Sequence, residues 1–319
     1  MRRTLSCALS VLLAVGNIAL AAEHDDSAKP ATRNEEARHD AHEKMQAAAV
    51  EKAVTTQHSL QLGGRSIAYQ ATAGTLTIRN DKNKPDARIV YVAYTADGKG
   101  DATKRPLTFV YNGGPGSSSI WLHLGSFSPV RIVTASPEAT APAPYRLVPN
   151  EYSLIDKSDL VFIDMVGAGY SRGFPSDKDK IDKDKGEKEA NPDKRFWGVD
   201  EDADEFARFI QRYITVNKRW NSPKFLFGES YGTTRSGALV KLLQDRGIAM
   251  NGVTILSSIL NYARRLPGSD FEYIYTLPTY AAIALYHDKL ANKPADLPAF
   301  LNEVRAFAGG EYASALAKG

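Results

Sequence analysis

The chain has 319 residues, of which 43% are hydrophobic and 24% are charged, an ordinary composition for one large or two average globular domains. Its formal net charge is +3, and Cys7 is its only cysteine. This charge is too small to indicate nucleic-acid binding, and one cysteine excludes an intramolecular disulfide.

The first 21 residues have the pattern of a secretory signal peptide. Arg2 and Arg3 form a basic start, an apolar stretch runs from Cys7 to Ile18, and Ala19-Leu20-Ala21 is a small-residue cleavage site. The apolar stretch is too short to anchor the chain in a membrane. We therefore expect a secreted or periplasmic protein that has no cysteine and no membrane attachment after cleavage, and no nucleic-acid partner.

The next segment, residues 22–56, is polar, charged and rich in alanine, so we predict a flexible charged leader before a folded domain at 57–319. Within it, His39 and His42 are one helical turn apart, a spacing that metal ligands also have. Nothing in the sequence around them would hold the two rings rigid, so we interpret them as part of a solvated charged segment.

The folded part begins with patterns typical of antiparallel strands. The segments SIAYQATAGTLTIRN and ARIVYVAYTAD are rich in β-branched and aromatic residues, and the turn sequence DKNKPD separates them. Two apolar runs follow, at Leu107–Tyr111 and Leu160–Ile163, and each leads into a glycine-rich turn. Such continuous runs are typical of central parallel strands, which are buried on both faces.

The second half alternates helices and strands. The Lys- and Asp-rich segment Ser176–Arg195 predicts a surface loop, and DEDADEFARFIQRYI has apolar residues at helical spacing after an acidic first turn. Strands predicted at Lys224–Phe227 and Val253–Leu256 flank a helix that ends near Gly247. This order predicts βαβ units in a parallel sheet, and beyond Leu260 the pattern is helical.

Ser230 lies in FLFGESYG, between a predicted buried strand and a predicted helix. The pattern Gly-x-Ser-x-Gly occurs by chance, and an ordinary strand-to-helix loop is the alternative interpretation. A nucleophile elbow, however, needs a strand before the serine and a helix after it, and both are present here. We therefore predict that Ser230 is the catalytic nucleophile.

The segment NGGPGSSS follows the strand at Leu107–Tyr111. It lacks the Gly-Lys-Ser/Thr ending of a phosphate-binding loop, which excludes that alternative. Glycines after an early strand can instead direct main-chain amides toward the nucleophile and form an oxyanion hole. We predict that the donors are the amides of Gly114 and Tyr231.

Three segments, NGGPGSSS, FIDMVGAGYSR and FGESYG, resemble in order and spacing the three sequence blocks of the serine carboxypeptidases. That family consists of α/β-hydrolases with a helical insertion. The resemblance implies an α/β fold with a mostly parallel sheet, flanking helices and a helical lid, here at 258–319. It also implies an enzyme without metal or organic cofactor that acts on the C-termini of peptides or proteins through a Ser230 acyl-enzyme.

The resemblance further implies that Asn112, Gly113 and Glu229 bind the substrate, with Asn112 and Glu229 recognising its terminal carboxylate. Two bare carboxylates repel, so Glu229 must carry a proton to donate a hydrogen bond, which implies activity at acidic pH. At two positions the chain departs from the family pattern. Ser117 replaces a disulfide-forming cysteine, and Ser126 aligns with a second glutamate that supports carboxylate recognition.

The acid and base of a catalytic triad follow the serine in an α/β-hydrolase. After Ser230 the chain offers one histidine, His287, in a helical stretch, with Asp245, Asp270 and Asp288 as acids. We interpret His287 as an ordinary helix residue and expect the catalytic Asp and His beyond Gly319, so that the chain is an N-terminal portion of the fold. An esterase or acyltransferase, or an inactive binding protein without the base, is the alternative.

Overall fold

The computed structural model describes residues 43, 45–98, 101–135, 138–176, 179, 191–259, 261–262 and 266–319. The predicted signal peptide, His39 and His42 lie outside the described residues, as does most of the predicted surface loop. The chain divides into two units, Met1–Ala47 and Ala48–Gly319, and the fold and the site lie in the second. Within the described part of the chain, no helix has both the length and the apolar character to cross a bilayer.

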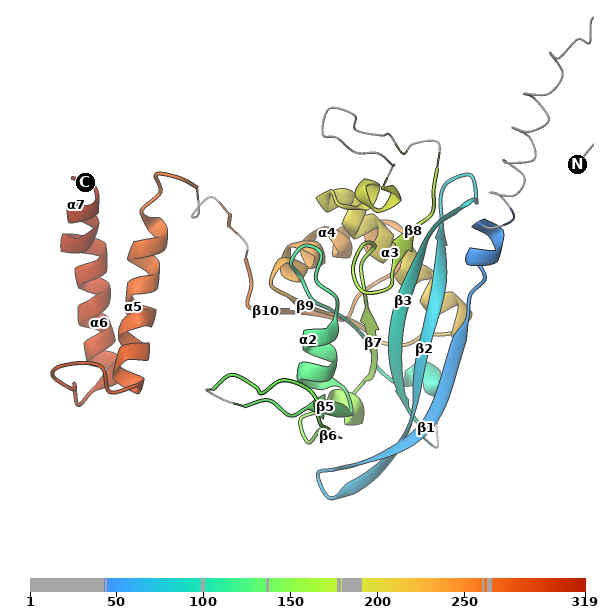
Figure 1. The fold of residues 1–319 in the computed structure, drawn as a ribbon, viewed down its shortest axis with the longest axis horizontal. Coiled ribbons are helices and arrows are strands. Elements are labelled where there is room, and N and C mark those ends of the chain that lie inside the picture. Colours follow the sequence, from blue (N-terminus) through green and yellow to red (C-terminus); the bar gives the residue numbers. More distant parts are fainter. Residues whose placement is uncertain are drawn as a thin grey trace, which may run out of the picture. The chain divides into compact units, whose positions relative to one another are not determined.

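The second unit is built on an eight-stranded mixed sheet with the order β1-β2-β3-β7-β4-β9-β10, in which β8 pairs with β3 (Figure 1). The strands are β1 (Ala53–Leu62), β2 (Arg65–Arg79), β3 (Pro85–Ala96), β4 (Leu107–Tyr111), β7 (Asp159–Ile163), β8 (Arg172–Gly173), β9 (Lys224–Glu229) and β10 (Gly252–Leu256). Strands β1, β2, β3 and β7 pair antiparallel, and β7, β4, β9 and β10 pair parallel. The predicted antiparallel start and parallel centre are confirmed.

Strand β1 begins at Ala53, four residues before the start that we predict for the folded domain. Most of its side chains are exposed, so the segment carries no burial pattern that the sequence could reveal. The pairing with β2 is continuous from Ala53 to Leu62. A small antiparallel pair of β5 (Val130–Ile132) and β6 (Leu147–Pro149) also has no counterpart among the predicted elements.

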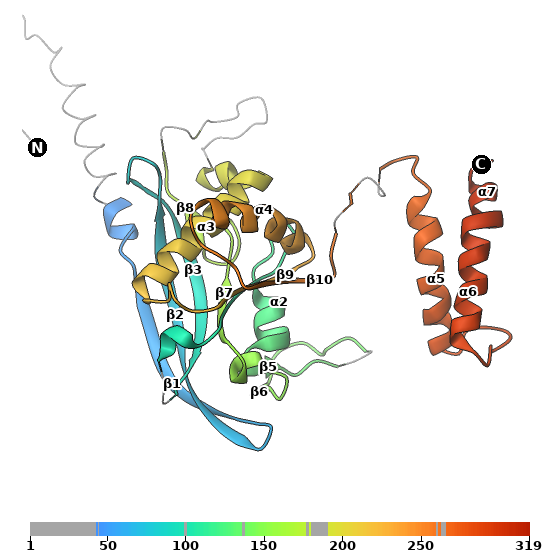
Figure 2. The ribbon, with the colours of Figure 1, turned by 180° about the vertical axis from the view of Figure 1, so that it is seen from behind.

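Helices cover the two faces of the sheet unequally. Helices α3 (Val199–Val216) and α4 (Tyr231–Asp245) pack on one face, where their apolar stripes join the larger core cluster (Figure 2). On the other face, α2 (Ile120–Leu122) and the 3-10 turn η4 (Leu154–Asp156) contribute Leu122 and Ile155 to a smaller cluster. Every residue of β4 and β7 is buried, which confirms that these apolar runs are central strands.

From Phe271 onward the chain consists of helices joined by turns, as the pattern predicts. Helices α5 (Phe271–Tyr286), α6 (Leu297–Phe307) and α7 (Ala313–Leu316) follow one another, with a π-helical turn, η8 (Ala308–Tyr312), before α7. Helix α5 contacts α6, and both contact η8. The role of these helices as a lid stays a prediction.

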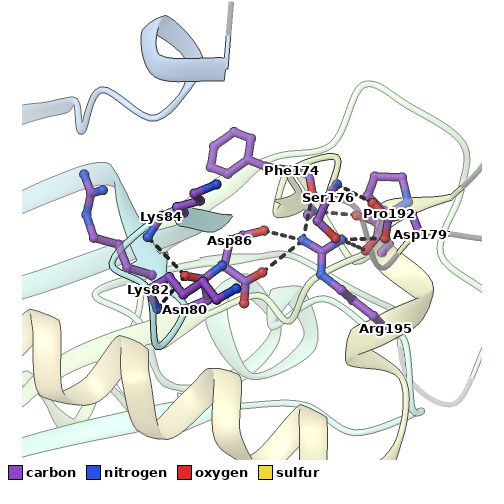
Figure 3. Close-up of polar contacts among 12 residues, drawn as sticks. Asn80, Lys82, Lys84, Asp86, Phe174, Ser176, Asp179, Pro192 and Arg195 are labelled. Carbon is purple, nitrogen blue, oxygen red and sulfur yellow. Dashed lines mark hydrogen bonds and ion pairs between the residues drawn. The ribbon is translucent and has the colours of Figure 1, made fainter. Parts of the chain in front are cut away.

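Part of the predicted polar loop is packed against the fold (Figure 3). Its last residues form a 3-10 turn, η6 (Pro192–Phe196), with Phe196 in the core. Arg195 donates to Asp179 (2.8 Å), to the Asp86 carboxylate (3.1 Å) and to the Phe174 carbonyl (2.6 Å). One guanidinium therefore ties the loop's two described ends to β3, contrary to the expectation that the whole segment is a solvated loop.

His123 begins a π-helical turn, η3 (His123–Phe127), and we expect it to make stability depend on pH. Its Nε2 lies 2.7 Å from the Tyr94 hydroxyl, its ring stacks on Phe162, and burial lowers its pKa from 6.5 to about 4. The unfolded chain takes up this proton below pH 6.5 and the folded chain does not. The unfolding free energy therefore loses at most about 3 kcal/mol from this group between pH 7 and pH 4.

The test is urea unfolding of the unsubstituted protein and of His123→Gln at several pH values. Glutamine can still bond to Tyr94 but does not titrate, so the difference in unfolding free energy between the two proteins should narrow or change sign as the pH falls. A difference in unfolding free energy that is constant from pH 7 to pH 4 would show that His123 does not make stability depend on pH.

Candidate active site

Ser230 is the single residue between the end of β9 at Glu229 and the start of α4 at Tyr231. Its φ of 56° and ψ of −124° are unfavourable for a residue with a side chain, as in a nucleophile elbow. Its amide donates to the Leu256 carbonyl of β10 (2.9 Å), which fixes the turn to the sheet. The Ser230 hydroxyl lines a cavity and has no hydrogen-bond partner among the described residues.

The glycines around Ser230 permit α4 to cross closely over β9. A Cβ atom added to Gly228 would lie 2.3 Å from the Gly232 carbonyl oxygen and 2.6 Å from Ser236 Oγ. Any side chain at Gly228 would therefore move the helix away from the strand. The close crossing brings the first turn of α4 to the carboxyl end of the sheet, where the Tyr231 amide has no acceptor within its own helix.

The loop after β4 packs against this elbow. A Cβ atom on Gly113 would lie only 2.4 Å from the Tyr231 amide nitrogen and 2.7 Å from the Glu229 carbonyl oxygen. Gly114 follows with a φ of 104° and lines the same cavity as Ser230. Neither the Gly114 nor the Tyr231 amide donates to the turn and loop carbonyls of the described chain. Both amides therefore lie at the elbow, and their role as oxyanion donors stays a prediction.

Asn112 and Glu229 meet beside Ser230. Asn112 Nδ2 donates to Glu229 Oε2 (2.9 Å), while Asn112 Oδ1 accepts from the Leu122 amide (3.1 Å). Asn112 is 3% exposed, and Glu229 is half-buried. Among the described residues, no hydrogen bond to the other Glu229 oxygen is found.

Asn112, Gly114, Glu229 and Ser230 line one cavity of about 390 Å³. Its wall also contains Trp121, which is exposed, and Ser257 from the end of β10. Ser117 and Ser126, the two departures from the family pattern, line it as well. The structure therefore brings Asn112, Gly114, Glu229 and Ser230 together around one space, with Gly113 and Tyr231 directly behind it.

The segment FIDMVGAGYSR makes hydrogen bonds to the end of the segment NGGPGSSS. Asp164 Oδ1 accepts hydrogen bonds from the amide (2.7 Å) and the hydroxyl (2.9 Å) of Ser119, at the start of α2. Two residues on, the Val166 amide donates to Glu205 Oε1 (3.0 Å). Burial, and then the charge of Asp202, raises the pKa of Glu205 well above its usual value.

The sequence interpretation missed a buried ion pair behind the cavity. Arg235 of α4 and Asp202 of α3 are 0% and 1% exposed and form two hydrogen bonds of 2.8 and 2.9 Å. The sequence nevertheless contains a signal for this pair. Arg235 lies on the same helical face as Leu239 and Leu243, and Asp202 lies on the face of Phe206. A base and an acid on the apolar faces of consecutive helices indicate such a pair.

The described residues do not identify the general base or its acid. His123 bonds to Tyr94, and His287 caps the C-terminus of α5, with its ring against Tyr286. Asp245 pairs with Lys241, and Asp288 pairs with Lys293. Among the described residues, none of these side chains hydrogen-bonds to Ser230, so the position of the triad acid and base stays a prediction.

The sequence aligns with those of known proteins. The chain is 29% identical over 172 residues to the pheromone-processing carboxypeptidase KEX1 of Saccharomyces cerevisiae, an alignment that covers 51% of this chain and 21% of that protein. The same enzyme from a second strain of that yeast, JAY291, aligns equally well. The chain thus spans about a fifth of the length of the curated relatives that it matches.

Solved structures also match the chain, at lower sequence identity. The crystal structure of the prohormone-processing carboxypeptidase KEX1(delta)p from S. cerevisiae matches with 18% identity and a TM-score of 0.44, covering 75% of this chain and 53% of that one. An acetyl xylan esterase from Paenibacillus sp. R4 matches with 11% identity and a TM-score of 0.38, covering 84% and 71%.

The strand order, with its antiparallel start and parallel centre, is that of an α/β-hydrolase sheet with the elbow after β9. The family model of the serine carboxypeptidases matches residues 65–267, well over half of the chain, and includes every residue that lines the cavity. The chain belongs to the serine carboxypeptidase family.

Proposed function

We propose that this protein is an exported serine-type carboxypeptidase that removes C-terminal residues from peptides. The observation that carries the proposal is the Asn112–Glu229 pair beside Ser230, in the cavity that also holds Gly114. A nucleophile with an oxyanion site would serve any acyl transfer, but a carboxamide and a carboxyl group fixed beside them suit a substrate with a free carboxylate.

In the proposed reaction, Ser230 Oγ attacks the carbonyl carbon of the last peptide bond and loses its proton to a general base. Negative charge develops on the carbonyl oxygen, where the amides of Gly114 and Tyr231 would receive it. Removal of one such donor typically costs about 3 to 4 kcal/mol of transition-state stabilisation. The C–N bond then breaks, the C-terminal amino acid leaves with a proton from the base, and water hydrolyses the acyl-serine.

The carboxylate of the leaving residue would be held by Asn112 and Glu229. Asn112 Nδ2 is a neutral donor that the Leu122 amide orients through Oδ1. Glu229 donates to a carboxylate only when it carries a proton, because two ionised carboxyl groups repel each other. Tight binding of a free C-terminus should therefore require acidic pH, and the chemistry requires no metal or organic cofactor.

Two other functions use the same cavity. An esterase or acyltransferase would form the same acyl-serine without the need for a substrate carboxylate. A binding protein would keep the Asn112–Glu229 pair while Ser230 stays unreactive. The carboxylate-binding pair favours the carboxypeptidase over the esterase, and the strained elbow favours an enzyme over a binding protein, because such strain persists mainly where function uses it.

The first test is the reactivity of Ser230. We expect the protein to release the C-terminal amino acid from N-blocked dipeptides at acidic pH and to be labelled at Ser230 by a fluorophosphonate, as found by mass spectrometry. Ser230→Ala should lose the label and at least about 10³-fold in activity, because the nucleophile is gone. Turnover of small esters alone would favour the esterase, and peptide binding without labelling would favour the binding protein.

The second test is the role of Glu229. In Glu229→Gln the side-chain amide donates without needing a titratable proton, so binding of a peptide carboxylate should change less between pH 5 and pH 7 than in the unsubstituted protein. Glu229→Ala should weaken that binding at pH 5 by about tenfold or more. Calorimetry with a peptide acid and its C-terminal amide measures both effects. If Glu229→Ala binds the peptide acid as tightly as the unsubstituted protein does, Glu229 takes no part in carboxylate recognition.

A further inference from the structure

Asn112 is the first residue after β4, and it lies outside the paired part of the sheet. The ladder between β4 and β9 ends at the pair Tyr111 and Gly228, so no neighbouring strand holds the Asn112 main chain. Its carbonyl oxygen instead accepts from Arg235 Nη1 at 2.9 Å. The main chain that carries the proposed carboxylate-binding amide is therefore held by a side chain from α4, five residues after Ser230.

Arg235 is itself held rigidly. Two of its nitrogens bond to the Asp202 carboxylate, and its guanidinium lies 4.2 Å from the ring centre of Phe206 and 5.3 Å from that of Tyr231. The side chain is completely buried, so water does not screen the pair or compete for its hydrogen bonds. The planar fork of arginine permits these contacts to be made together, which an ammonium group cannot reproduce.

A second contact reaches the oxyanion loop. Arg235 Nη2 lies 3.5 Å from Met165 Sδ, and the same sulfur accepts from the Gly116 amide at 3.1 Å. The guanidinium thus touches the main chain at Asn112 directly and the loop at Gly116 through Met165. Asn112 lines the cavity, whereas Arg235, Met165 and Gly116 are not among its lining residues.

We propose that Arg235, fixed by Asp202, is a positioning residue that sets the selectivity of the site for a free C-terminal carboxylate by holding Asn112 against Glu229. This inference rests on the proposed function, because it assigns a determinant to the same carboxylate-binding pair. Without the hydrogen bond from Arg235, the Asn112 carbonyl and side chain can shift. Ser230 stays fixed, because its amide bonds to the Leu256 carbonyl. The expected signature is weaker binding of free acids with little change for substrates that lack the carboxylate.

The fold offers a matched control in the ion pair of Arg219 and Asp159. These side chains are 6% and 3% exposed, with a 2.7 Å bond, and Arg219 also donates to a main-chain carbonyl, that of Arg105 (2.9 Å). Asp159 is the first residue of β7, whereas the cavity lies at the carboxyl ends of β4 and β9. Arg219→Lys thus disturbs a similar buried pair at the opposite edge of the sheet.

The experiment measures binding at pH 5 in the full chain with Ser230→Ala, using an N-blocked dipeptide acid and its C-terminal amide. We expect Arg235→Lys, and separately Asp202→Asn, to lower the acid-to-amide affinity ratio about tenfold, and Arg219→Lys to leave it within twofold. Thermal unfolding of each variant shows whether the losses of stability are comparable.

Glu229→Ala separates the two ways in which the idea can fail. If Glu229→Ala lowers the ratio and Arg235→Lys and Asp202→Asn do not, Arg235 is only structural and the inference is overturned. An equal drop of the acid-to-amide affinity ratio in Arg219→Lys would also overturn the inference, since the drop would then result from a general loss of stability. If Glu229→Ala leaves the ratio unchanged, the proposed carboxylate site itself is wrong.

Discussion

The candidate site depends on one close approach between two main-chain segments. The loop that begins at Asn112 passes so near the start of α4 that a single methyl group on Gly113 would overlap the Tyr231 amide. This contact places Asn112 against Glu229 and brings the loop of Gly114, a predicted oxyanion donor, to the elbow that carries Ser230 and Tyr231. A wider separation would still give an α/β sheet with an exposed serine, but without a preorganised site for negative charge.

Main chains at such a distance need support from behind, because glycine-rich segments supply no side chains to pack. The support comes from buried polar groups. Arg235 holds the Asn112 carbonyl, Asp164 holds the start of α2, and the Glu205 carboxyl accepts from Val166. Each of these groups would destabilise an apolar core if it had no partner, and each instead bonds to a main-chain group that lies outside the strands.

Much of this architecture could be predicted from the sequence. The central strands are continuous apolar runs, and the pattern Gly-x-Ser-x-Gly between a strand and a helix identified the elbow, because both signals are local. Strand β1 and the β5–β6 pair were missed because their side chains are largely exposed or only partly buried, so pairing rather than apolar burial defines them. The contact of Arg195 with Asp86 was missed for another reason, since a charged segment predicts solvation unless its distant partners are known.

The site, too, could be predicted from the sequence only in part. Local motifs predicted which residues would surround the cavity, and the structure brings them together. They did not identify the buried pair of Arg235 and Asp202, which lie 33 residues apart and whose signal is a charged residue on the apolar face of each of two helices rather than a local motif. The general base stays a prediction for a physical reason too, because a triad is defined by contact with Ser230, and no described histidine makes that contact.

The buried titratable groups also bear on the acidic pH that the proposed reaction requires. Burial lowers the pKa of His123 to about 4, so this group costs stability as the pH falls below 6.5. Burial raises the pKa of Glu205, so the folded chain keeps a proton that the unfolded chain loses, and this group favours the fold more as the pH falls toward 4.5. The two contributions to the unfolding free energy have opposite signs as the pH falls below 6.5 toward 4.5. At moderately acidic pH both of these side chains stay neutral in the fold, so neither of them adds a charge to the core there.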